Sequence, residues 1–186
     1  MNKLQRRNFE LRAKGDGKTL YGKIAYNSRS EDLGGFIEVI APGAFTESLR
    51  VQEVHCYWQH DSSKILGRQS NDTLRLTDTP GALKFECDLD PNTTFGSDCI
   101  AALKRGDIVA NSFGFGIEPG DSEWSQDQSG LMLRTVRRAT LFECSPVSSP
   151  AYKANSAGIR SDDRSNEELV DQIRIRRLFA ALRDRG

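Results

Sequence analysis

The chain has 186 residues, and its 26 Lys and Arg balance its 26 Asp and Glu, so the formal net charge is zero. Hydrophobic residues make up 37% and charged residues 28%, which excludes a disordered tail, and no apolar run approaches the ~20 residues that span a bilayer. This length predicts one main domain, the balanced charge argues against nucleic-acid binding, and the polar start lacks the apolar middle of a secretory signal. We therefore expect a cytoplasmic protein.

The first half of the chain predicts short strands joined by turns. Residues 8–26 have the alternation and the glycine-containing turn of a hairpin. The other extended segments expected here are residues 36–40, 54–60, 74–76 and 83–87. Residues 42–49 fit a short helix, with a proline in its first turn.

The second half predicts one helix and more strands. Residues 97–105 fit a helix with Ser97 as N-cap and Gly106 as its end. Extended segments follow at residues 108–117, 131–136 and 140–144, and the polar residues 121–130 are expected to form a solvent loop. Many short strands, two embedded helices and no βαβ rhythm favour a mostly β fold of the α+β type, either an antiparallel barrel or a curled sheet.

The last segment has a different pattern. Ser165 and Glu168 form a capping-box pattern before an apolar stripe at helical spacing, and arginines crowd the far end. This predicts an amphipathic helix within residues 161–186, outside a domain of residues 1–160. The helix packs on the core or on a second subunit of a homo-oligomer such as a dimer; the alternative is a tail that binds scaffold or nucleic acid.

The first candidate for chemistry is His60, in the expected strand at residues 54–60. Side chains alternate along a strand, so His60 shares its apolar face and His55 lies on the other face. A histidine at a strand end, on an inward face, can act as a general base. The alternative is a structural histidine that caps the sheet.

The second candidate is Ser112, in the strand predicted at residues 108–117. Alternation turns Phe113 and Phe115 toward the core and leaves Ser112 on a face otherwise made of alanine and glycine. A strand with so little side-chain bulk lets another backbone approach closely. The alternative is a strand whose glycines mark a tight bend.

The third candidate is Glu143, which is expected to share a partly buried face with Leu141 and Val147. A buried carboxylate needs a charged or hydrogen-bonding partner. Either Glu143 orients His60, or it forms a structural salt bridge. The arginines considered for that salt bridge are Arg134, Arg137 and Arg138.

The sequence does not predict a metal or cofactor site. The chain has two histidines, and its four cysteines include no Cys-x-x-Cys pair. Nothing supports an extracellular disulfide framework, so we expect small buried thiols. The cysteines are Cys56, Cys87, Cys99 and Cys144.

These residues lie within motifs that resemble a known family in their order and spacing. Trp58-Gln59-His60-Asp61, then Ser112-Phe113-Gly114-Phe115, then Glu143-Cys144-Ser145-Pro146-Val147 resemble three signatures of the prohead maturation proteases of tailed bacteriophages. Pro42-Gly43-Ala44-Phe45 resembles a further block of that family, and the resemblance runs from about residue 20 to residue 159.

The resemblance implies a serine endopeptidase with an antiparallel β-barrel flanked by helices, similar to the herpesvirus assemblins. It implies that Ser112 is the nucleophile, His60 the general base and Glu143 the third member. The assemblins use a second histidine in that last role. His55 is the only other histidine here, and alternation places it on the opposite face from His60, which favours Glu143.

The resemblance also implies a place and partners. Such an enzyme works without a cofactor inside the immature capsid, in the bacterial host cytoplasm, where it degrades scaffold protein, trims the major capsid protein and usually cleaves itself. The substrate is expected to dock beside the glycine strip by strand addition. Arg137-Arg138 resembles an arginine pair near the assemblin oxyanion site, although surface arginines explain it equally well. A non-enzymatic capsid-assembly or scaffold-binding module is the alternative function.

Overall fold

The structure is a computed structural model that describes residues 5–13, 18–108, 110–127 and 130–148. Its strands are β1 (Gln5–Ala13), β2 (Thr19–Ala25), β3 (Phe36–Ile40), β4 (His55–Trp58), β5 (Asp61–Arg68), β6 (Leu74–Asp78), β7 (Ala82–Asp88), β8 (Ala110–Gly116), β9 (Ser122–Gln126), β10 (Met132–Val136) and β11 (Thr140–Val147). Its helices are α1 (Ser48–Val51), the 3-10 turn η1 (Gln69–Asn71) and α2 (Thr94–Arg105).

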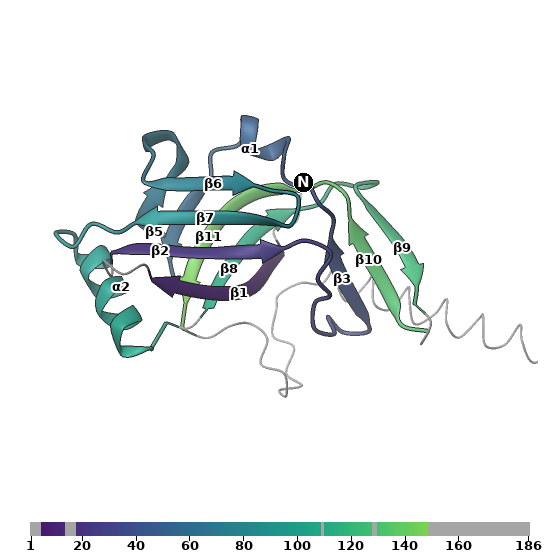
Figure 1. Ribbon diagram of the computed structural model, residues 1–186, viewed down its shortest axis with the longest axis horizontal. Coiled ribbons are helices and arrows are strands. Elements are labelled where there is room, and N and C mark those ends of the chain that lie inside the picture. The colour runs from purple at the N-terminus through teal and green to yellow at the C-terminus, as the bar shows by residue number, and fades with distance from the viewer. Residues whose placement is uncertain (1–4, 14–17, 109, 128–129, 149–186) are drawn as a thin grey trace, which may run out of the picture.

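The strands form two sheets that lie side by side in Figure 1. The larger has the order β5-β4-β11-β8-β1-β2-β7-β6 and the smaller the order β3-β10-β9. Both are mixed, because β4 pairs with β11 and β3 pairs with β10 in parallel. The mostly β fold with few helices agrees with the prediction. The closed antiparallel barrel is not confirmed, since β5 and β6 end the larger sheet.

Two strands that are far apart in sequence pair with the two edges of β8. The first strand, β1, pairs with it on one side, with Asn8 opposite Ser112, and β11 pairs with it on the other, with Ser145 opposite Ser112. The predicted hairpin of residues 8–26 is present as the antiparallel pair of β1 and β2. Ser112 therefore lies on a strand that is inside the sheet.

Several boundaries differ from the prediction. Residues 121–130 are not only a loop, because β9 pairs with β10 there. The helix expected at residues 42–49 is a run of turns, and α1 begins only at Ser48. Helix α2 begins earlier than expected because the Thr93 side chain, rather than Ser97, accepts from Gly96 N as N-cap; Gly106 ends it at φ 80°, as predicted. Strand β5 was not expected.

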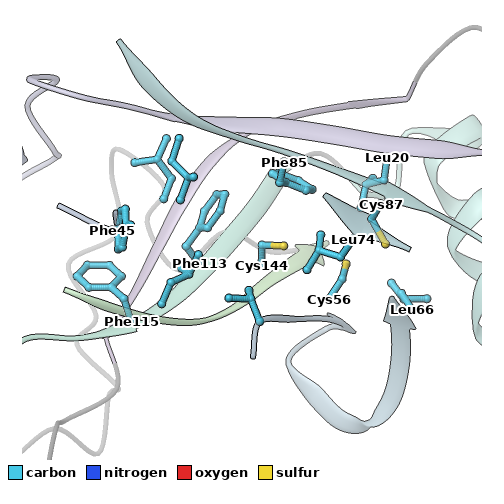
Figure 2. Packing of buried hydrophobic residues seen from close by; sticks show 14 of the residues in the cluster. Leu20, Phe45, Cys56, Leu66, Leu74, Phe85, Cys87, Phe113, Phe115 and Cys144 are labelled. Carbon is cyan, nitrogen blue, oxygen red and sulfur yellow. The ribbon is translucent and has the colours of Figure 1, made fainter. Parts of the chain in front are cut away.

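The hydrophobic core lies against the face of the larger sheet that carries Phe113 and Phe115 (Figure 2). Phe113 meets Phe85 edge-on with ring centroids 5.5 Å apart, and Phe115 meets Phe45 at 5.9 Å. Aromatic pairs of this geometry add packing energy beyond the area they bury. The prediction that these two phenylalanines face the core is confirmed.

All four cysteines are free thiols buried in this core, as predicted. Figure 2 shows Cys56, Cys87 and Cys144 close together between the strands. A hydrogen bond with Cys144 and burial both raise the pKa of Cys56, and burial raises the pKa of Cys99 to about 12. These thiols stay protonated near neutral pH and are inert as nucleophiles.

The smaller sheet has its own buried ion pair. The Arg134 guanidinium donates to the Glu38 carboxylate through Nε, at 2.8 Å, and through a terminal nitrogen. It lies over the rings of Phe36 and Trp124, 5.1 and 5.7 Å from their centroids. Cation–π contacts of this kind add to the attraction of the paired charges.

No helix among the described residues is long and apolar enough to cross a membrane. The predicted C-terminal helix lies outside the described residues. The division into residues 1–160 and 161–186 therefore stays a prediction.

Candidate active site

His60 lies in a tight turn between β4 and β5, and not in the strand where the sequence placed it. The strand ends at Trp58, which pairs with Asp61, so Gln59 and His60 are the two turn residues. Both have left-handed backbones, with φ 54° and φ 64°. Two positive φ values in succession are the mark of a type I′ hairpin turn. Because His60 lies in the turn, the direction of its side chain does not follow the alternation of side chains along β4.

Hydrogen bonds of the Gln59 backbone and side chain hold this turn against β11 and the residue that follows it. Gln59 N donates to the carbonyl of Pro146 at 3.2 Å, and the Gln59 side-chain oxygen accepts from Ser148 N at 3.2 Å. Left-handed backbone at residues other than glycine costs of order 1–3 kcal/mol and persists where surrounding contacts impose it. Here those contacts place His60 beside the part of β11 that carries Glu143.

A β-bulge sets the direction of Glu143. Leu141 pairs with Phe115 and Glu143 pairs with Gly114, so Phe142 is an extra residue on β11. Leu141 is fully buried in the core. The bulge turns Glu143 to the opposite face, so the expectation that Glu143 shares a face with Leu141 is wrong. The carboxylate is nevertheless buried, as predicted, with Glu143 4% exposed.

Glu143 and His60 are in direct contact. His60 Nδ1 lies 3.0 Å from Glu143 Oε1, and the two side chains are 20% and 5% exposed. The arginines considered as structural partners bind other carboxylates: Arg134 pairs with Glu38, Arg137 with Glu123, and Arg138 with Asp121 and Glu47. Of the two interpretations of Glu143, the contact with His60 is therefore the one the geometry supports.

His55 also lies near Glu143, although it does not replace it. The two residues are directly paired between β4 and β11, so they share a face of the sheet. The His55 ring stacks on Tyr57, with centroids 5.3 Å apart. Burial and the nearby charge of Glu143 raise the pKa of Tyr57. The prediction that alternation separates His55 from His60 used a strand that ends before His60, so that reason does not hold.

Gly114 provides the room for the Glu143 side chain. A Cβ at Gly114 would lie 2.6 Å from Glu143 Cγ and 2.8 Å from Oε1. The carboxylate side chain thus lies directly over the bare Cα of β8. This corrects the expected role of the glycine strip: strand addition needs a free edge, and both edges of β8 are paired, with β1 and β11.

Ser112 lies on the same face as Glu143, two residues from Gly114. It is 1% exposed, and its Oγ has no hydrogen-bond partner among the described residues. His60 therefore contacts Glu143 but makes no hydrogen bond to Ser112. Catalytic hydrogen bonds are often long in a free enzyme and tighten when substrate binds.

The side chains and backbone of Arg137 and Arg138 are already engaged. Their backbone N–H groups both donate to the carbonyl of Asp121, at 2.8 and 3.2 Å. Their guanidinium groups are exposed and pair with Glu123 and Asp121, respectively. Of the two interpretations of this pair, surface arginines fit the structure better than oxyanion donors. Among the described residues, no group of three or more His, Cys, Asp or Glu is arranged to hold a metal ion.

Sequence reasoning missed two residues of this site. Ser145 donates its hydroxyl to Glu143 Oε2 at 2.8 Å, and Gly114 accommodates the Glu143 side chain. Ser145 could have been found from its spacing, since residues two apart on a strand share a face. The role of Gly114 depends on the cross-strand register, which the sequence does not contain.

One of three comparisons with known proteins finds a match, which is to a family model. A family model described as caudovirus prohead serine protease matches residues 7–169. That match covers most of the 186 residues and includes His60, Ser112 and Glu143. No curated protein and no solved structure matches the chain significantly.

Proposed function

The chain belongs to the caudovirus prohead serine proteases, and from that premise we propose that it is a serine endopeptidase with Ser112, His60 and Glu143 as its catalytic residues. The observation that carries this assignment is the 3.0 Å contact between His60 Nδ1 and Glu143 Oε1. It is formed on the sheet face that also carries Ser112, one strand away. An imidazole oriented by a carboxylate beside a serine is the arrangement that Ser-His-Asp and Ser-His-Glu hydrolases use for acyl transfer.

The proposed mechanism assigns one task to each side chain. Glu143 accepts a hydrogen bond from the Nδ1–H group of His60, which fixes the tautomer in which Nε2 is free to act as a base. His60 Nε2 takes the Ser112 proton as Oγ attacks the scissile carbonyl, and then gives a proton to the leaving amine. Water activated by the same imidazole hydrolyses the acyl-enzyme. Glu143 stabilises the imidazolium formed at each step.

Substrate binding has to change the surroundings of Ser112 in this mechanism. The residue is 1% exposed and its Oγ is not bonded to His60. Attack requires Oγ to be about 3–3.5 Å from the carbonyl carbon and within hydrogen-bond reach of Nε2. We therefore propose that the substrate uncovers Ser112 and closes the bond to His60 in the same event.

We propose the major capsid protein and the scaffold protein as substrates, with self-cleavage, inside the immature capsid in the host cytoplasm. The family supports a role in capsid maturation.

We also propose that the protein forms a homo-oligomer such as a dimer. In the same proposal, the C-terminal helix contacts a second subunit or the scaffold protein. Deletion of residues 164–186 should change the oligomer mass or reduce encapsidation; if it changes neither, both roles of the helix are dismissed.

One observation favours a second function, a capsid-assembly or scaffold-binding module without chemistry. Ser112 is buried and not bonded to His60, which is also what an inert serine would look like. In that case, His60 and Glu143 would be a structural pair. The two functions differ in whether the Ser112 hydroxyl is activated.

A fluorophosphonate probe distinguishes the two functions, because it modifies only activated serines. We expect one adduct, which peptide mapping places at Ser112, and none in Ser112→Ala. Ser125→Ala, at an exposed serine of β9, is the matched control and should label normally. With co-expressed capsid or scaffold protein, Ser112→Ala should abolish cleavage and Glu143→Gln should slow it. Undiminished processing by Ser112→Ala would eliminate the assignment.

A further inference from the structure

A second serine lies beside the proposed catalytic residues. Ser145 is directly opposite Ser112 across β11 and β8, so their Cβ atoms are about 5 Å apart. Glu143 is two residues before Ser145 on the same strand and shares its face. Two serines and one carboxylate are thus grouped on adjacent strands, and their hydrogen bonds give them different roles.

The hydroxyl of Ser145 is committed to the carboxylate. Its Oγ donates to Glu143 Oε2 at 2.8 Å, while the other carboxylate oxygen, Oε1, faces His60 Nδ1 at 3.0 Å. The Oγ of Ser112 has no partner among the described residues. Because the Ser145 proton points to Glu143, its hydroxyl is not available to His60. Within the part of the chain that the structure describes, Ser112 is the serine of this pair whose hydroxyl makes no hydrogen bond.

Burial gives the bond between Ser145 and Glu143 its importance. Ser145 is 0% exposed and Glu143 is 4% exposed, so water cannot replace the serine hydroxyl as a donor without a change in packing. Hydrogen bonds to an ionised group in a dry site are stronger than neutral ones. A carboxylate held at both oxygens cannot rotate about its last bond, so Oε1 keeps its direction toward His60.

From this geometry we infer that Ser145 is a positioning residue: its hydroxyl fixes the Glu143 carboxylate, and through it the His60 ring. The inference rests on the proposed function for its catalytic meaning. Ser145 does not touch the substrate in this scheme. Ser145 acts through Glu143. Loss of the Ser145 hydroxyl should therefore leave Ser112 in place and change the orientation of the His60 ring, which is the proposed base.

The test compares Ser145→Ala with a control at another buried serine of similar bonding. Ser48 Oγ accepts from Leu141 N at 2.9 Å, so Ser48→Ala also removes a buried serine hydrogen bond to β11. Ser145→Thr keeps a hydroxyl at the site and tests for rescue. A hydrogen bond to a charged group corresponds to roughly a 10- to 100-fold effect, so we expect the fluorophosphonate labelling rate at Ser112 to fall by that factor in Ser145→Ala alone.

A second measurement reads the position of His60 without any catalysis. In full-length chains that also carry Ser112→Ala, which cannot cleave themselves, NMR of the ring N–H groups follows His60, one of only two histidines. We expect a downfield, exchange-protected Nδ1 proton signal in the Ser112→Ala chain and in the same chain with Ser48→Ala added. In Ser145→Ala this signal should broaden or vanish.

The two measurements separate the inference from the proposed function. If Ser145→Ala labels at the parent rate and keeps the His60 signal, Ser145 does not position the pair and the inference is overturned. The inference is also overturned if Ser145→Ala and Ser48→Ala lower the labelling rate or the His60 signal equally. It is overturned as well if the Ser112→Ala chain without either change shows no His60 Nδ1 proton signal. If the parent never labels at Ser112 but the His60 signal still depends on Ser145, the peptidase assignment fails while the positioning of His60 stands.

Discussion

Replacing Gly114 by alanine tests whether a bare Cα on β8 is required for the histidine–carboxylate pair. The added Cβ would lie 2.6 Å from Glu143 Cγ, 2.8 Å from Oε1 and 3.1 Å from Cδ. Three atoms of one buried side chain are too close at once, so no small rotation of Glu143 relieves all of them. The carboxylate has to leave the position in which it meets His60.

The size of the effect follows from these distances. Reaching an ordinary contact means moving Cγ from 2.6 Å to at least 3.4 Å, a displacement of about 0.8 Å. Overpacking of this kind costs about 1–3 kcal/mol, and the reduced freedom of the unfolded chain offsets about 0.4–1 kcal/mol. We expect the free energy of unfolding to fall by about 1–2 kcal/mol. Misplacing a catalytic group by about 1 Å costs about 100-fold in rate.

The assay pairs urea unfolding with the fluorophosphonate labelling rate at Ser112. Gly81→Ala is the control, because a Cβ at Gly81 meets nothing within 4 Å. It should change the unfolding free energy by no more than about 0.5 kcal/mol and leave labelling unchanged. If Gly114→Ala behaves like Gly81→Ala in both measurements, the placement of Glu143 over Gly114 is wrong.

Three other predictions concern stability and the thiols. Glu38→Leu removes the carboxylate that faces buried Arg134, so urea unfolding should show a loss of about 3–5 kcal/mol, against less than about 1 kcal/mol for Glu123→Leu at an exposed ion pair. Thr93→Ala deletes the N-cap of α2 and should cost about 1 kcal/mol, read as a lower Tm; an unchanged Tm would contradict the cap. At about pH 8 the native thiols should react with a disulfide reagent only as fast as the chain unfolds, because all four are buried and the pKa of Cys99 is raised to about 12. Fast reaction of one or more thiols per folded chain would refute their burial.

The parts of the site that could be predicted depend on alternation along single strands. Phe113 and Phe115 face the core and Ser112 the other side because β8 is a regular strand, and its pattern is readable without its neighbours. Glu143 is buried as predicted, but one of the two neighbours used for that prediction, Leu141, lies on the opposite face because of the bulge. The residues alone left the contact of Glu143 with His60, 83 positions away, as one of two alternatives, and the resemblance to a family favoured it.

The parts that could not be predicted are local departures from regularity and pairings between distant strands. Gln59-His60 has none of the Asn-Gly or Asp-Gly character of type I′ turns, so the end of β4 at Trp58 was not visible. The bulge at Phe142 reverses the face of Glu143, and the sequence does not mark it. Strand β9 is polar and, among the described strands, pairs only with β10, so its sequence is typical of a loop.

The position of β8 between the first strand and the last described strand bears on when this protein becomes competent during its synthesis. A nascent chain that stops before residue 140 lacks β11, and with it both Glu143 and one hydrogen-bonded neighbour of the strand that carries Ser112. Pairing such distant segments is also slow, because the chain must close large loops first. Under the proposed function, ribosome-bound intermediates could not cut nearby polypeptides, because Ser112, His60 and Glu143 come together only after translation has passed this point.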